Sequence, residues 1–159
     1  MANWCSNFIQ TDNKDVIEVF KHLAKKEEIE GEGQTLDYFE DDRFLFNIVV
    51  EDGYISCETR WAPCINTIFN LAKRFNCRIE LDYDEPGNLL FGKYIVQGKD
   101  ETAYYLTDVD FDLFVYNEDT DNYTFEGKEW ESDSDIKELL LERKMNGTNN
   151  WTSKRLFKV

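Results

Sequence analysis

An Asp52-Gly53 pair lies between two strand-like segments, and this feature most constrains how the chain can fold. Residues 44–50 and 54–59 on either side are rich in β-branched and aromatic side chains, as strands usually are. Asp-Gly in that position is a strong signal for a tight hairpin, because both residues tolerate the left-handed backbone of the turn. The chain around this hairpin is therefore expected to build an antiparallel sheet.

Amphipathic helices are predicted on both sides of the hairpin, at residues 12–28 and 63–75. The first apolar stripe contains Val16, Val19, Phe20 and Leu23, and the second contains Ile65, Ile68, Phe69, Ala72 and Phe75. Spacing by three and four residues places each stripe on one helix face. Thr11 or Asp12 can cap the first helix, and Pro63 suits the first turn of the second.

Further strands are predicted at residues 4–10 and 77–83. The order is then strand, helix, strand, strand, helix, strand, which is the split βαβ or ferredoxin-like pattern. We expect an α+β fold in which both helices cover one face of a four-stranded antiparallel sheet. Residues 1–98 would form this ferredoxin-like core.

Residues 99–159 are predicted to be an acidic extension, packed on the same domain, with more strands and a terminal helix. A strand at residues 90–97 and another at 102–107 would flank a turn at Gly98. Hydrophobic residues from Val109 to Val115 alternate with aspartates, which predicts a half-buried strand with its aspartates in water. A helix is expected at residues 133–145. The basic, aromatic tail at residues 151–159 can dock on the domain or fray.

Negative charge is concentrated between Asp108 and Glu142, where thirteen acidic side chains face only Lys128 and Lys137. The whole chain carries a formal charge of −15. Such a surface repels nucleic acid and anionic membranes, and it attracts basic protein surfaces. The candidate partner-binding residues are Asp108, Asp110, Asp112, Glu118, Asp119 and Asp121.

The sequence contains no recognisable catalytic or metal-binding constellation, so no catalytic residue, metal or cofactor is predicted. His22 is the only histidine, and Cys5 is its only conceivable nucleophilic partner. The four cysteines are too far apart for typical zinc-ligand pairs and are expected to be reduced core residues. Asp108 to Asp112 resembles the start of a calcium loop, but Leu113 replaces the glycine that such a loop needs.

Three sequence clusters resemble the YubB-like ferredoxin-like proteins of phages, plasmids and bacterial genomes. They are Asn3, Trp4, Cys5 and Asn7; then Thr59, Trp61 and Pro63; then Tyr83, Glu85, Gly87 and Gly92. The resemblance covers about residues 1–98. It implies the ferredoxin-like fold and a link to mobile elements, and it brings no established activity.

Each cluster residue also has a physical interpretation. We expect Trp4 and Trp61 to be buried packing residues, and Asn3 and Asn7 to bond neighbouring backbone. Glycines in the third cluster would relieve a turn and a bulge. Glu85 is expected at the surface.

Three functions remain open. The first is a non-enzymatic interaction protein that binds a basic protein surface, without nucleic acid or membrane. The second is an acidic DNA mimic that inhibits a nucleic-acid-binding host protein. The third is a carboxylate- or metal-dependent enzyme. No apolar stretch is long enough for a membrane span and no secretory signal is visible, so a cytoplasmic protein is expected. The oligomeric state stays undetermined.

Overall fold

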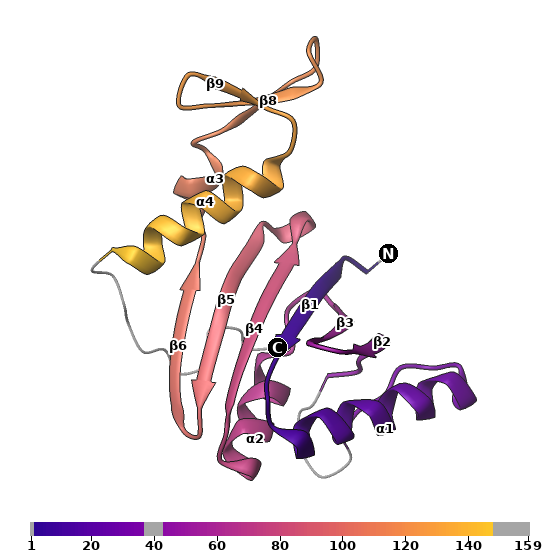
Figure 1. Ribbon diagram of the computed structural model, residues 1–159. Coiled ribbons are helices and arrows are strands. Elements are labelled where there is room, and N and C mark those ends of the chain that lie inside the picture. The colour runs from indigo at the N-terminus through magenta and orange to yellow at the C-terminus, as the bar shows by residue number, and fades with distance from the viewer. Residues whose placement is uncertain (1, 37–42, 148–159) are drawn as a thin grey trace.

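The computed structural model describes residues 2–36 and 43–147, and a six-stranded antiparallel sheet dominates this part of the chain (Figure 1). The strand order is β2-β3-β1-β4-β5-β6. The strands are β1 (Trp4–Gln10), β2 (Phe46–Glu51), β3 (Tyr54–Arg60), β4 (Arg78–Glu85), β5 (Leu90–Gln97) and β6 (Asp100–Tyr105). The first four strands have the order of the ferredoxin-like fold, and β5 and β6 continue the sheet beyond β4. The sequence-based fold class is therefore confirmed.

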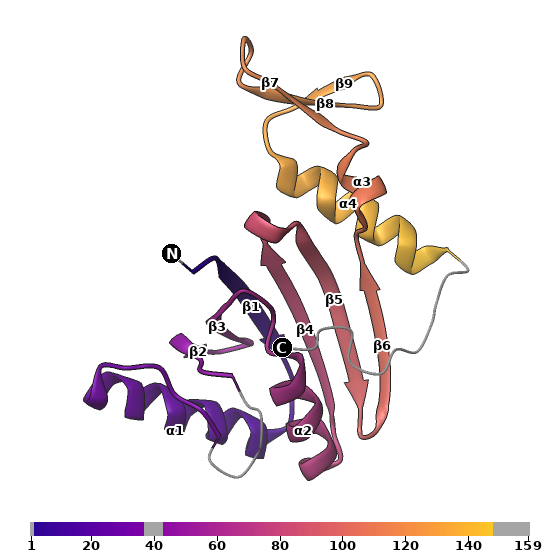
Figure 2. The ribbon, with the colours of Figure 1, turned by 180° about the vertical axis from the view of Figure 1, so that it is seen from behind.

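Two helices cover one face of this sheet, as Figures 1 and 2 show. They are α1 (Lys14–Glu30) and α2 (Ile65–Phe75). Their buried stripes pack on Cys5, Ile9 and Leu81, which point to the same side of the strands. This layer is the main hydrophobic core, and it holds the four cysteines, all buried and without disulfides.

The predicted helix starts are wrong by one or two residues. The cap of α1 is Asn13, not Thr11 or Asp12, because the Asn13 carboxamide oxygen accepts the N–H of Val16 at 3.0 Å. Cys64 is the N-cap residue of α2, so Pro63 precedes the helix instead of lying in its first turn. Local caps depend on side-chain contacts that propensity alone does not reveal.

The strand predicted from Val109 to Val115 is wrong. The short helix α3 (Asp108–Phe111) occupies most of this segment, and β7 starts only at Val115. A capping box explains the helix, since the Asp110 carboxylate accepts both the N–H of Thr107 at 2.7 Å and its hydroxyl at 3.0 Å. The alternation of apolar residues and aspartates was misleading because a cap competes locally with strand formation.

A small second sheet follows α3 and was not predicted from the sequence. Within the described residues it consists of β7 (Val115–Asn117), β8 (Asn122–Phe125) and β9 (Lys128–Trp130). Figures 1 and 2 show it at the far end of the molecule from α1 and α2. The predicted terminal helix is present as α4 (Asp133–Asn146). The tail at residues 151–159 lies outside the described residues.

A second hydrophobic cluster joins these elements to the large sheet. Its buried members are Leu106, Phe125, Ile136, Leu140 and Leu141. Phe91 and Tyr104 from β5 and β6 pack against it. The extension is thus attached to the sheet face opposite α1 and α2, which we call the open face.

Candidate functional site

The three sequence clusters, which are far apart in the chain, meet at one end of the sheet. β1 lies between β3 and β4, with Trp4 opposite Arg60 and Ser6 opposite Asp84. Because both pairings are antiparallel, the start of β1 adjoins the ends of β3 and β4. The backbone also connects the first two clusters, since Trp61 donates its N–H to the Asn3 carbonyl at 2.8 Å.

Asn7 is the centre of a buried polar network between the first and second clusters. Its carboxamide nitrogen donates to the Cys5 carbonyl at 3.1 Å and to the Thr59 hydroxyl at 2.9 Å. Its carboxamide oxygen accepts the N–H of Cys64 at 3.1 Å. Asn7 therefore connects β1, β3 and the start of α2. The expected bond to neighbouring backbone is present at Cys5, and further bonds reach Thr59 and Cys64.

A left-handed turn places Trp61 at the surface. Its φ is +70°, a conformation that non-glycine residues rarely adopt. The Thr59 hydroxyl stabilises the turn by donating to the Ala62 carbonyl at 2.6 Å. The Trp61 ring is 49% exposed and Trp4 is 41% exposed, so the expectation that both are buried is wrong. Alternation along β1 buries Cys5 and leaves Trp4 on the open face.

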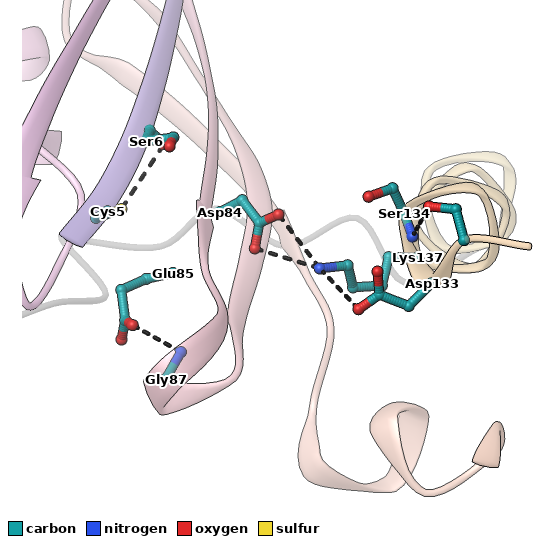
Figure 3. A network of polar contacts seen from close by, with 9 residues as sticks. Cys5, Ser6, Asp84, Glu85, Gly87, Asp133, Ser134 and Lys137 are labelled. Atoms are coloured by element: carbon teal, nitrogen blue, oxygen red, sulfur yellow. Dashed lines mark hydrogen bonds and ion pairs between the residues drawn. The ribbon is translucent and has the colours of Figure 1, made fainter. Parts of the chain in front are cut away.

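Glu85 is buried, which overturns its expected surface position. It is 1% exposed, and one carboxylate oxygen accepts the N–H of Gly87 at 2.8 Å (Figure 3). The other oxygen accepts the N–H of Asn88 at 2.9 Å. The carboxylate thereby caps the 3-10 turn η1 (Pro86–Asn88). A Cβ at Gly87 would lie 2.4 Å from the Asn3 carboxamide nitrogen, so this glycine permits close packing of the first and third clusters.

Gly92 leaves space for a tyrosine ring and does not form the expected bulge. It pairs with Tyr83 in a register between β4 and β5 that is continuous. A Cβ at Gly92 would lie 2.4 Å from the Tyr83 hydroxyl oxygen and 2.6 Å from the Tyr104 carbonyl oxygen. Burial raises the pKa of Tyr83, so the phenol stays protonated even in alkaline solution where a free tyrosine ionises.

The structure places no activated nucleophile in this region. Burial, followed by the nearby Cys64 and Glu85, raises the pKa of the Cys5 thiol, and a protonated thiol is a poor nucleophile. His22, the only histidine, is exposed on α1. Among the described residues, no group of three or more histidines, cysteines or carboxylates is arranged to hold a metal ion.

The open face carries a group that we call the aromatic cluster, formed by the exposed Trp4 and Arg60 and the half-buried Phe46. The rings of Trp4 and Phe46 meet edge to face with their centroids 5.1 Å apart. The Arg60 guanidinium lies 5.7 Å from the Trp4 centroid and 4.9 Å from that of Phe46. Phe8 is a further exposed ring on β1, at 48%. The site residues predicted from the sequence included none of Phe8, Phe46 and Arg60, although alternation along residues 4–10 puts Phe8 on the face of Trp4.

Carboxylates accompany these rings on the open face. Glu58 is opposite Phe46, and Asp82 is opposite Phe8. Asp82 pairs with Lys93 at 3.1 Å. The exposed part of the face is therefore both aromatic and acidic, with Arg60 stacked on the rings.

Lys137 attaches α4 to the open face. Its ammonium group lies 3.2 Å from Asp84 on β4 and 3.5 Å from Asp133 one turn earlier on α4 (Figure 3). It also lies 5.1 Å from the centroid of Phe91. The side chain is only 4% exposed, so the lysine contributes to the attachment of the extension and not to surface charge.

The six predicted partner-binding acids do not form one ordered face. Asp108 and Asp110 belong to α3 and Asp112 caps it, whereas Glu118, Asp119 and Asp121 surround the β7–β8 turn. Two have internal contacts. Asp110 lies 2.7 Å from Lys144, and Asp121 accepts the Tyr116 hydroxyl at 2.6 Å.

The pKa of Asp110 reflects this internal role. Partial burial alone would raise the pKa, but hydrogen bonds from Lys144 and Thr107 outweigh burial and lower it. Asp110 is consequently a charged anchor between α3 and α4. Asp108 and Asp112 remain exposed.

A family model provides the comparison with known proteins. It is described as the ferredoxin-like domain in Api92-like protein, and it matches residues 37–126. Searches of curated proteins and of solved structures gave no match. No helix in the described part of the chain has the length and apolar character to cross a membrane. The match spans β2 to β8 and more than half of the 159 residues, and the chain therefore belongs to the family of ferredoxin-like domains found in Api92-like proteins.

Proposed function

We propose that this chain is a non-enzymatic interaction protein that binds a basic protein surface through the open face of its sheet. The observation that carries the proposal is the aromatic cluster, in which Trp4 and Arg60 are exposed and Phe46 is half-buried, on a face that also bears carboxylates. Tryptophan and arginine dominate the energetics of many protein interfaces. The neighbouring Glu58 and Asp82 would favour a partner with basic side chains.

A protein partner is better supported than RNA. Some ferredoxin-like sheets stack RNA bases on exposed aromatic side chains, and the open face has such side chains. The formal charge of −15 would repel the RNA backbone, and Glu58 and Asp82 lie beside the rings that a base would contact.

The other two functions have less support. A DNA mimic would need its acids on one convex, ordered face, whereas half of the candidate acids surround the β7–β8 turn. An enzyme would need converging carboxylates with perturbed pKa values in a cleft. The buried Glu85 instead uses both oxygens to cap a turn.

The resemblance to YubB-like proteins supports a cytoplasmic accessory role linked to a phage or plasmid. This finer assignment rests on the three clusters quoted above. The family match overlaps the resemblance over residues 37–98 and extends beyond it, into the acidic segment.

The experiment is affinity capture from the native host with the full chain, followed by binding kinetics with the captured protein. A Trp4→Ser/Phe8→Ser variant should lose at least tenfold in affinity, equivalent to about 1.4 kcal/mol. A Val109→Ser/Val115→Ser variant is the control, since both valines are exposed on the extension. Equal affinity for both variants would refute binding through the open face.

A second arm tests the acidic extension. An Asp108→Asn/Asp112→Asn/Glu118→Gln/Asp119→Gln variant should slow association at low salt if these acids steer the partner. An unchanged association rate would mean that these acids contribute only to solubility. A single-stranded RNA probe is included, and binding of RNA through Trp4 and Phe8 would contradict the proposal.

A further inference from the structure

A groove runs between α4 and the open face of the sheet. Phe8 and Phe91 contribute apolar side chains from the strands, and Leu141 and Met145 contribute them from α4. The groove has a volume of about 530 Å³. It lies beside the aromatic cluster and is lined by none of its three residues.

The rim of the groove is acidic. Asp82 and Asp84 line the sheet side, where Lys93 and Lys137 pair with them. Glu138 and Glu142 line the α4 side, one turn apart, and neither forms an ion pair with a side chain in the described part of the chain. An apolar floor under two uncompensated carboxylates fits a segment that is both basic and aromatic.

The chain itself contains such a segment directly after α4. Residues 148–159 contain Lys154, Arg155 and Lys158 and no acidic side chain, together with Trp151, Leu156, Phe157 and Val159. Among residues 108–147 acids predominate strongly, so this change of charge is abrupt. The positive charge and apolar side chains of this segment therefore complement the acidic rim and apolar floor of the groove.

The segment is also within reach. From Met145 back to Glu138 the helix rises only about 10 Å, whereas twelve extended residues span about 40 Å. A tether this short gives an effective concentration of about millimolar, so even weak contacts can hold the segment in place.

We propose that residues 148–159 dock in cis in this groove, with aromatic side chains on its apolar floor and Lys154 and Arg155 against Glu138 and Glu142. The docked segment covers Phe8 and Asp82, which belong to the open face. It therefore acts as an internal ligand that a basic partner must displace. The docking itself does not depend on the proposed function, because Trp4, Phe46 and Arg60 lie outside the groove.

Paramagnetic relaxation in the full chain tests the docking. A nitroxide label is attached at Ser153→Cys, and the four native cysteines are buried and protected from labelling. Amide signals of Phe8, Asp82 and Lys93, across the groove from α4, should broaden strongly. In a Glu138→Gln/Glu142→Gln background, the loss of two exposed ion pairs should reduce the docked-to-undocked ratio about tenfold and restore these signals.

A matched control is Glu129→Gln/Glu131→Gln, which changes the net charge equally but alters carboxylates that do not line the groove. It should leave the broadening unchanged. Broadening confined to amides near Met145 would overturn the proposal. Broadening in a mixture of labelled and isotopically enriched chains, but not within one chain, would also overturn it and assign the groove to a second copy. Broadening that persists in the Glu138/Glu142 variant would refute the electrostatic argument.

Discussion

Replacement of Asn7 by alanine should destabilise the domain more than the loss of a single hydrogen bond would. The side chain is fully buried and bonds three segments: β1, β3 and the start of α2. Its bond to Thr59 contributes about 1 kcal/mol net, and a buried Cys64 N–H that loses its acceptor costs about 1–3 kcal/mol. The free energy of unfolding should therefore fall by about 2–4 kcal/mol.

Urea denaturation followed by circular dichroism measures this change. The denaturation midpoint should fall while the m value stays constant, because the surface exposed on unfolding is the same. Ser6→Ala is the control, since Ser6 is the next residue on the opposite, open face and its loss should cost no more than about 0.5 kcal/mol.

A double-mutant cycle with Thr59→Val separates the network from simple packing. The Asn7–Thr59 pair should show a coupling energy of about 0.5–3 kcal/mol, as expected for residues in one hydrogen-bond network. A loss below about 0.5 kcal/mol for Asn7→Ala would refute the reasoning, since it would mean that the buried N–H of Cys64 does not depend on Asn7.

Three further outcomes are expected. Gly92→Ala should cost about 1–3 kcal/mol in urea denaturation, because the new Cβ meets the Tyr83 ring and the Tyr104 carbonyl; full stability would show that the strands can separate there. Trp61→Ala should cost less than about 1 kcal/mol because the ring is half exposed, and a loss of about 3–5 kcal/mol would indicate a buried ring. Burial raises the pKa of Cys5, so the unfolded state binds fewer protons in alkali and stability should fall above about pH 8.5; urea midpoints under reducing conditions should fall less for Cys5→Ala.

The sequence predicted the elements whose signals are local and repeated. The Asp52-Gly53 hairpin, two helical stripes and period-two alternation were sufficient for the ferredoxin-like core. These patterns are reliable because each strand or helix must hide one face, whatever its neighbours are. Locally encoded signals failed where two competed, as at Thr107 and Asp110, where a capping box produced a helix instead of the predicted strand.

The candidate site was only partly predictable. The sequence singled out Asn7, Trp61 and Glu85. Their roles depend on a partner 57 residues away, as for Asn7 and Cys64, or on the turns that follow β3 and β4. The Arg60 stack on Trp4 requires the β1–β3 register to be known. Such contacts arise only when strands align, so composition and spacing cannot reveal them.

The sequence alone therefore determined the element order of the ferredoxin-like core, the fold class and the strong negative charge of this protein. Tertiary structure decided which residues are exposed: it brought Trp4 and Trp61 to the surface, buried Glu85 and paired the groove-lining Asp84 with Lys137. The physical reason is that periodicity assigns a side chain to one face of its own element, whereas burial depends on what covers that face. Here α1 and α2 pack over the main core on one side of the sheet, and α4 covers only part of the other.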